Sequence, residues 1–292
     1  MFNIGQAIKD LRQAVGLSQE ELASGICNQA QISNLENNNA TPSAMLLNQI
    51  ATKLGVDMNY FFEMQESHKI EYLQNSKKYI RKSIRIRDYE NLYNTILSEK
   101  KHPYYQETEN LQFLLWHEAI CIHYVKKEST RALEMLNKAL QMTNNRKYYT
   151  EQEIEILISI SIIETETKLY TKSEDDFKKA LDSFKNTPQI TNPSIELRII
   201  YGLSKLLTDT GRYQESLDYS LKGIRLCKQL ETLYVLGELH YQCGSNYARM
   251  GEKEKAISAF DKAINIFELQ SNHLYVQLVK KYRAELLGIE ES

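Results

Sequence analysis

The chain has 292 residues, roughly twice the ~150 residues of a typical domain, so it has room for two units or one extended array and is not a miniprotein. Its 36 Lys and Arg are balanced by 38 Asp and Glu, a formal charge of -2, which excludes a general electrostatic attraction to polyanions. With only 11 Gly and 4 Pro among 42% hydrophobic residues, we expect an all-α protein and disfavour disorder or a multi-stranded sandwich.

Residues 1–66, which we call the head, carry the start and stop signals of four short helices. After a first amphipathic run, Ser18 and Glu21 form a predicted capping box that begins a second helix. Asn28 is a favourable N-cap for a third helix, and a fourth apolar run closes at Gly55. Two short helices joined by a tight turn, the second with exposed amide side chains, are typical of a helix-turn-helix.

The sequence of this region resembles a known DNA-binding domain. The stretch LSQEELASGICNQAQISNLENN is similar to the helix-turn-helix of the phage-repressor (Xre/Cro) family, including Gln19 at the start of the second helix and Glu36 at the end of the third. Arg12 lies where that family usually pairs an arginine with this glutamate. The resemblance therefore implies a DNA-binding domain at residues 1–66.

The residue types of the third helix suit contacts with DNA, because Gln and Asn can bond an adenine edge bidentately and helix N-termini favour phosphate. For the base edges we predict Gln29, Ala30 and Asn34, with Gln31 as a peripheral contact. For the DNA backbone we predict neutral donors, namely Gln19, Asn28, Ser33 and Asn38. The alternative is a capped four-helix cluster with a merely polar surface.

The charge of the head favours that alternative. Residues 1–66 contain three Lys or Arg and seven Asp or Glu, a net charge of -4, whereas DNA affinity rests largely on cations that release counterions. One such head should bind weakly. Two heads held together on a palindrome would overcome this weakness, because binding of the second head becomes intramolecular. We therefore predict a homodimer on palindromic double-stranded DNA.

Residues 67–87 reverse this charge, with seven Lys or Arg against one acid and apolar residues between them, and predict a linker helix. A solvated helix face is the ordinary interpretation of such a run. In the functional interpretation its C-terminal cations, Arg85 and Arg87, face an anionic ligand.

From residue 88 to 292 the chain repeats itself. The last copy places Gly244, Ala256 and Phe260 at the spacing of a tetratricopeptide repeat. The position of Ala256 recurs at steps of 40, 41, 43 and 40 residues, at Leu92, Ala132, Ser173, Ser216 and Ala256. We expect an α-solenoid of about five degenerate repeats with long helices, capped by a final helix from His273 to Leu287.

A repressor-type head on such an array resembles the Gram-positive peptide-sensing regulators known as the RRNPP family, and within it the PlcR-like branch. The segments ICNQAQISNLE, RDYENLYNTI and LHYQCG carry this likeness. The resemblance implies a quorum-sensing transcription regulator whose solenoid groove binds a short reimported peptide, which alters the spacing of the DNA-binding heads. We expect it to act as an activator.

The repeat positions also predict a peptide site. The groove side should include Arg198, Tyr201, Lys205, Glu238, Tyr241 and Ser245, with Tyr275 from the capping helix. The resemblance implies peptide contacts from Glu238, Tyr241 and Tyr275 together with Arg85 and Arg87 of the linker. Arg and Lys can hold carboxylates while Tyr offers an apolar face with a polar tip. Glu238 stands where this branch should have a glutamine, and would repel an anionic partner. The alternative for each residue is an ordinary surface position.

The sequence contains no recognisable motif for an enzyme, a metal site or a cofactor site. His117 and His123 are six residues apart, whereas the zincin motif spaces its histidines by four, and no phosphate loop, dinucleotide fingerprint or nucleophile elbow is present. We expect neither an enzyme nor a bound metal or cofactor.

The sequence also bears on the cellular compartment of the protein. The opening MFNIGQAIKD lacks the apolar core of a signal peptide, no run is long and apolar enough for a membrane helix, and the four Cys form no close pair, so we expect a cytoplasmic protein without membrane contact.

Two other functions stay open: an adaptor whose solenoid binds a partner protein, and a redox or small-molecule sensor using Cys121, Cys227 or Cys243.

Overall fold

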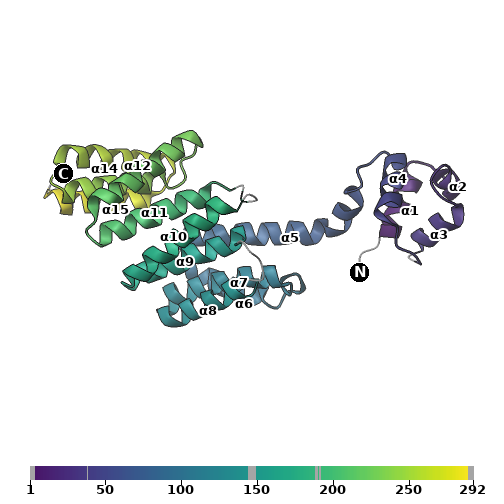
Figure 1. Cartoon of the computed structure of the whole chain (residues 1–292), viewed down its shortest axis with the longest axis horizontal. Coiled ribbons are helices and arrows are strands. Elements are labelled where there is room, and N and C mark those ends of the chain that lie inside the picture. The colour runs from purple at the N-terminus through teal and green to yellow at the C-terminus, as the bar shows by residue number, and fades with distance from the viewer. Residues whose placement is uncertain (1–3, 38, 144–148, 188–189, 191, 289–292) are drawn as a thin grey trace. The chain divides into compact units, whose positions relative to one another are not determined.

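The computed structural model describes residues 4–37, 39–143, 149–187, 190 and 192–288, without the side chains of 62–68. Throughout these residues the regular structure is helical, without strands, which confirms the all-α prediction (Figure 1). The chain divides into two compact units, Met1–Arg87 and Asp88–Ser292. Among the described residues, no helix combines the length and the apolar composition that crossing a bilayer requires.

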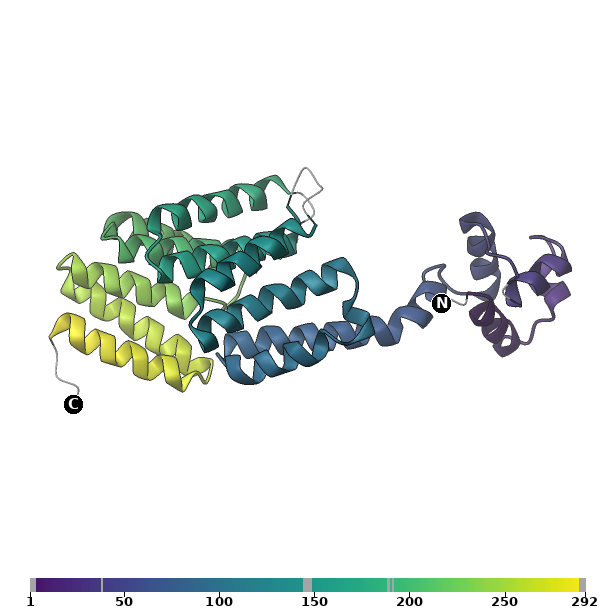
Figure 2. The same ribbon diagram turned by 90° about the horizontal axis from the view of Figure 1, so that it is seen from below.

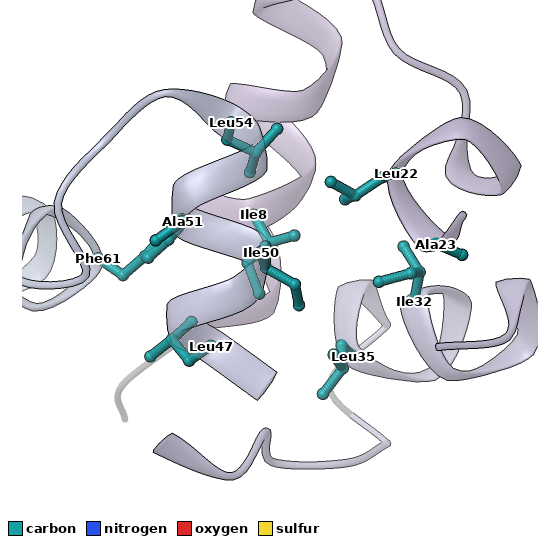
Figure 3. Packing of buried hydrophobic residues seen from close by; sticks show 10 residues of the cluster. All are labelled: Ile8, Leu22, Ala23, Ile32, Leu35, Leu47, Ile50, Ala51, Leu54 and Phe61. Atoms are coloured by element: carbon teal, nitrogen blue, oxygen red, sulfur yellow. The ribbon is translucent and has the colours of Figure 1, made fainter. Parts of the chain in front are cut away.

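Unit 1 is the head with a long helix attached. Its helices are α1 (Ile4–Ala14), α2 (Gln19–Ala23), α3 (Gln29–Glu36), α4 (Ala44–Leu54) and α5 (Tyr60–Arg85). One apolar face of each helix enters a common core, to which Ile8, Leu22, Ile32, Ile50 and Phe61 contribute fully buried side chains (Figure 3). This core fixes α2 and α3 against α1 and α4.

The predicted caps of α2 and α3 are both present. The Ser18 hydroxyl accepts from the Glu21 amide at 3.1 Å, and the Glu21 carboxylate accepts from the Ser18 amide at 2.7 Å. The Asn28 side chain accepts from the Gln31 amide at 2.8 Å. Each cap stabilises its helix by about 1 kcal/mol, so the start of α3 is fixed locally.

The linker helix begins earlier than the sequence suggested. We expected it from residue 67, but α5 starts at Tyr60, and its first turn places Phe61 in the core of the head. Neither Gly nor Pro occurs between residues 56 and 102, so nothing interrupts the helix until Arg87 adopts a positive φ of 59°. Residues 67–85 are therefore a continuation of a helix rooted in the head.

Unit 2 is a stack of antiparallel helix pairs (Figure 2). Its α-helices are α6 (Tyr89–Glu99), α7 (Thr108–Cys121), α8 (Ser129–Gln141), α9 (Glu151–Glu166), α10 (Tyr170–Asn186), α11 (Ser194–Asp209), α12 (Tyr213–Gln229), α13 (Leu236–Arg249), α14 (Lys253–Leu269) and α15 (His273–Leu287). Two short turns complete it, the 3-10 turn η1 (Pro103–Tyr105) and the π-helical turn η2 (Ile122–Lys126).

The repeat positions read from the sequence occupy equivalent places in this stack. The five marker residues lie in α6, α8, α10, α12 and α14, and all five are fully buried: Leu92, Ala132, Ser173, Ser216 and Ala256. The last four of them are in the second helix of a pair. The steps exceed the usual ~34 residues because the helices are long, with 16 residues in α9 and 17 in α10. α15 packs on α13 and α14 as the expected terminal helix.

Small residues allow the close packing within a pair. A Cβ atom on Gly244 of α13 would lie 2.8 Å from the Phe260 ring of α14, so only glycine admits this contact. In the preceding pair the sequence has Ser220 where the aromatic ring belongs, and the structure fills that place with a polar cluster instead. Ser204 and Ser220 share a hydrogen bond of 2.5 Å, and Asn246 of the next repeat donates to Ser216 at 2.7 Å.

Candidate DNA-contacting helix and candidate peptide-binding face

The polar residues predicted to contact DNA lie on the solvent side of α3. The exposed ones are Asn28, Gln29, Ala30, Gln31 and Asn34, while Gln19 and Ser33 are half-buried. On the opposite side of α3, Ile32 and Leu35 are buried in the core (Figure 3). Asn38 lies outside the described residues. The fold thus presents the amide side chains of α3 as one exposed row.

A buried ion pair holds α3 from behind. Arg12 of α1 donates to both carboxylate oxygens of Glu36, at 2.6 and 2.9 Å, and to the Leu17 carbonyl at 2.6 Å. Burial opposes ionisation of Glu36, but hydrogen bonds from Arg12 and Gln19 outweigh it and lower its pKa. The pair expected from the repressor resemblance is therefore present.

Two glutamines extend this pair to the surface. Gln19 donates to Glu36 at 2.8 Å, and Gln29 donates to the Gln19 carbonyl oxygen at 2.7 Å. A glutamine amide has two N–H donors and one carbonyl acceptor, so Gln29 keeps one donor and its acceptor for another partner. This is the pattern that matches the N7 and N6 edge of adenine. The chain Arg12–Glu36–Gln19–Gln29 therefore orients the Gln29 amide at the surface.

The cations of the head are not part of this exposed row. Arg12 is buried with Glu36, and Lys53 of α4 donates to the Ser24 carbonyl at the end of α2. The helix α3 itself contains no Lys or Arg. Contacts from α3 would therefore be made by neutral donors and acceptors, with little counterion release.

The candidate peptide site is spread over the first helices of successive repeats. α9 packs on α11, α11 on α13 and α13 on α15, so these four helices form one continuous layer, which we call the first-helix layer. Seven of the predicted peptide residues belong to α11, α13 and α15 of this layer, namely Arg198, Tyr201, Lys205, Glu238, Tyr241, Ser245 and Tyr275. Arg85 and Arg87 belong to unit 1, and both are exposed.

Both cations of the layer that were predicted to bind peptide already have acidic neighbours. Arg198 forms an ion pair with Glu155 of α9, and burial, which opposes its charge, is outweighed by this carboxylate, so its pKa is raised. Lys205 lies 4.0 Å from the carboxylate of Glu166, also on α9. A ligand carboxylate would therefore compete with a carboxylate of the protein at each cation.

Sequence reasoning missed these two acids, although a signal for one existed. Glu155 precedes Arg198 by 43 residues, one repeat step, so the two occupy the same position in consecutive repeats. Glu166 is also held by η2, since it accepts from His123 at 2.8 Å and from Tyr124 at 3.0 Å. Burial opposes ionisation of Glu166, but its partners lower its pKa.

The remaining predicted residues supply mainly aromatic surface. Tyr241 packs against Phe260 and Tyr282, with ring centroids 5.9 and 6.1 Å apart, and burial raises its pKa to about 12. Tyr275 packs on Phe267, and Tyr201 is half-buried beside the core of α11 to α13. Ser245 is buried, with its hydroxyl bonded by Arg249, and Glu238 is half-buried.

The thiols and metal-ligating side chains form no further site in the described part of the chain. Cys121, Cys227 and Cys243 are buried, and burial raises their pKa values to about 12, 11 and 12. No group of three or more His, Cys, Asp or Glu gathers there in a geometry suited to a metal ion.

Comparison with known proteins assigns the family. Residues 77–287 match the RNPP family C-terminal domain, and residues 8–61 match a helix-turn-helix family. No curated protein sequence matches significantly.

Solved structures agree with this assignment. The chain is 26% identical to Bacillus thuringiensis PlcR in complex with the peptide PapR7 and DNA, over 96% of this chain and 99% of that one, with a TM-score of 0.77. For apo PlcR the identity is 25% and the TM-score 0.70, over 96% and 99% of the two chains. ComR of Streptococcus vestibularis in complex with its signalling peptide XIP shares the fold, at 16% identity and a TM-score of 0.59 over 98% and 99%. Since the RNPP domain spans more than half of its length, the chain belongs to the RNPP family, whose members are DNA-binding regulators and not enzymes.

Proposed function

We propose that the protein is a quorum-sensing transcription activator of the cytoplasm, which binds operator DNA as a homodimer under the control of a short signalling peptide. Residues 1–66 bind DNA, residues 67–87 link the domains, and residues 88–292 bind the peptide and dimerise. The observation that carries the proposal is the hydrogen-bonded chain from Arg12 to Gln29, which ends on the exposed row of α3. PlcR, solved with both a peptide and DNA, supports the pairing of the two ligands.

We assign the contacts with DNA to neutral side chains. Gln29, Ala30 and Asn34 contact base edges, with Gln31 at the periphery, whereas Gln19, Asn28, Ser33 and Asn38 contact phosphates or sugars. Because the head has a net charge of -4, one head binds weakly, and a palindrome engaged by two tethered heads supplies the affinity.

In the proposed peptide site, the first-helix layer combines apolar tyrosine rings with cations that already have acidic neighbours. Tyr201, Tyr241 and Tyr275 pack against the apolar side chains of the peptide. We also assign a peptide contact to Ser245, a buried residue of the same helix as Tyr241. Arg198 and Lys205 bind peptide carbonyls or carboxylates by partly displacing Glu155 and Glu166. We also assign peptide contacts to Arg85 and Arg87 of the linker and to Glu238 of α13.

Two alternatives have weaker support. An adaptor that binds only a partner protein gives no reason for a buried ion pair to orient Gln29 at the surface. A redox sensor needs a thiolate, and burial of Cys121, Cys227 and Cys243 raises their pKa values to about 12, 11 and 12.

The test is a gel-shift series on the promoter region of the gene itself, with and without synthetic peptides from short secreted reading frames beside it. We expect a specific complex whose affinity rises with the cognate peptide. The double variant Gln29→Ala/Asn34→Ala should lose it, whereas Gln13→Ala/Gln49→Ala, which removes two exposed amides outside α3, should retain it. Absence of a specific complex with every peptide would refute the proposal.

A further inference from the structure

The first helices of three consecutive repeats each end on a charged residue. α9 ends at Glu166, α11 at Asp209 and α13 at Arg249. These residues are 43 and 40 positions apart, which are the repeat steps in this part of the chain, so they occupy equivalent places in the first-helix layer. We call these three residues, together with Lys205 one turn before Asp209, the charged rim.

The charged rim adjoins the aromatic part of the proposed peptide site. Arg249 donates to the Ser245 hydroxyl. Burial is the main reason why the pKa of Tyr241 is raised to about 12, and among its charged neighbours Arg249 lowers this pKa while Asp209 raises it. Since Lys205, Tyr241 and Ser245 are all predicted peptide residues, a peptide on the first-helix layer would meet the charged rim.

The two cations of the rim retain donors for a ligand. Lys205 approaches Glu166 at 4.0 Å, which is too far for a hydrogen bond, and Glu166 already accepts from His123 of η2 at 2.8 Å. Arg249 uses its Nη1 for Ser245, while a guanidinium has five N–H donors in all. An ammonium and a guanidinium are the side-chain groups that bind carboxylates most strongly.

Asp209 is the residue of the rim least suited to its place. No donor among the described residues lies within hydrogen-bonding distance of its carboxylate. It also ends a helix, where the partial negative charge of the C-terminus disfavours an acid. Although the residue keeps exposed surface, partial burial of the carboxylate raises its pKa. The partners of Glu166 lower the pKa of that acid, so Asp209 is the one whose environment favours protonation.

The charged groups that face Asp209 come from the first helices around it. Lys205 of α11 and Arg249 of α13 stabilise its charge, and Glu166 of α9 opposes it. Among the described residues, neither α10 nor α12, which also pack on α11, brings a charge that acts on it. With Asp209 ionised, the rim has two cations and two anions. Protonation of Asp209 leaves a net positive charge, which attracts a carboxylate.

We propose that Lys205 and Arg249 bind a carboxylate of the signalling peptide, and that Asp209 competes with this carboxylate unless it is protonated. The inference rests on the proposed function and adds Arg249 and Asp209 to the peptide site. A bound carboxylate is a like charge beside Asp209 and raises its pKa further, so that binding takes up a proton. The affinity is therefore highest below the pKa of Asp209 in the free protein, and falls as the pH rises through its higher pKa in the complex.

Titration calorimetry on the full-length chain tests the role of Asp209. The probes are synthetic peptides from the C-terminal ends of short secreted reading frames beside the gene, at about pH 5.5 and about pH 7.5, each in two buffers of different ionisation enthalpy. We expect the wild type to bind more tightly at the lower pH and to take up protons. Asp209→Asn should bind roughly tenfold more tightly than the wild type at about pH 7.5, and should lose the pH dependence and the proton uptake. The matched control is Asp175→Asn, an exposed aspartate of α10, which should behave as the wild type.

Two modified peptides identify the carboxylate that is bound. One carries a C-terminal amide, and the other has each Asp or Glu side chain replaced by Asn or Gln. We expect one of the two to bind the wild type roughly tenfold more weakly than the unmodified peptide. The same modification should make little difference to Lys205→Gln or Arg249→Gln, because the cation that it depends on is gone.

The outcomes separate this inference from the proposed function. Absence of binding by every peptide, to the wild type and to Asp209→Asn alike, would refute the proposed function and this inference with it. Peptide binding with the same affinity and pH dependence in the wild type and Asp209→Asn would overturn the inference alone. So would peptide binding that is insensitive to both modifications.

Discussion

Gln29 is the exposed end of a hydrogen-bonded chain that begins at a buried ion pair. Its own side chain is in solvent, where a glutamine ordinarily samples several rotamers. Fixing the side chain in one rotamer therefore costs conformational entropy. Gln19 removes part of that freedom by accepting its N–H at 2.7 Å, and Glu36 in turn fixes Gln19. The residue that would contact a base is thus oriented by residues that never touch it.

Removal of Gln19 should therefore weaken DNA binding through Gln29. We expect Gln19→Ala to cost about 1 to 2 kcal/mol of binding energy, roughly a tenfold loss in affinity, from one lost backbone contact and a freed Gln29. Fluorescence anisotropy with labelled operator measures it. Because no charge is removed, the salt dependence of binding should not change, and a flatter salt dependence would contradict this role.

The ion pair behind this chain should make the head sensitive to acid. The pKa of Glu36 is lowered in the folded head, so its contribution to stability is complete above the unfolded value of ~4.3 and is lost as pH falls through the folded value. Hydrogen exchange of the α3 amides at pH 7 and below pH 4 measures this loss. We expect Glu36→Gln to destabilise the head by about 3 kcal/mol at pH 7 and to flatten its acid dependence. An unchanged acid dependence would show that other carboxylates control it.

The thiols provide a test of the redox alternative at the same scale. Cys121, Cys227 and Cys243 are buried, and only Cys27 is half-buried. We expect at most one thiol to react quickly with a chromogenic disulfide in the native protein, and all four in denaturant. Fast reaction of two or more native thiols would restore a redox role to consideration.

At the scale of helices, the repeats are held by two different kinds of packing. In the last pair the Phe260 ring lies against Gly244. Between α11, α12 and α13 the corresponding space holds hydroxyl and amide groups, where Asn246 donates to Ser216 at 2.7 Å and accepts from Thr208 at 2.9 Å. A fully satisfied polar cluster of this kind stabilises one register between adjacent repeats.

The polar cluster predicts a specific loss of stability. Asn246→Ala removes the hydrogen bonds of Asn246 with Thr208 and Ser216 at a fully buried site, although both hydroxyls keep other partners in the cluster, and should cost about 2 kcal/mol. Urea unfolding followed by the single tryptophan, Trp116, reports on this unit because that side chain is buried in α7. Asn265→Ala, on the exposed side of α14, is the control and should change stability by less than ~0.5 kcal/mol. Equal effects of the two changes would contradict the role of the cluster.

At the scale of the whole molecule, local signals proved predictable and long-range pairings did not. The capping box at Ser18 and the N-cap at Asn28 depend on residue types within a few positions, the five repeat markers depend on a pattern that recurs along the sequence, and the structure has all of them. The early start of α5 depends on Phe61 entering a core built from other helices. Such a contact is invisible to local periodicity.

The acids that compensate the predicted peptide-binding cations escaped prediction for the same reason. Glu155 meets Arg198 only when two repeats stack, and Glu166 is shared by Lys205 and the η2 residues His123 and Tyr124. The repeat period could reveal the first pair, since its members are one step apart. The second depends on a π-helical turn for which the sequence gives no signal.

The central claim is that Gln29, fixed from behind, contacts an adenine edge in the operator. The most direct measurement compares operator DNA containing adenine with DNA containing 7-deazaadenine at each half-site position, for the wild type and for Gln29→Ala. At one symmetric position the wild type should lose about tenfold in affinity, because the N7 acceptor is gone, while Gln29→Ala should be indifferent to the change. Equal losses for both proteins, or no loss for the wild type at any adenine, would contradict the account.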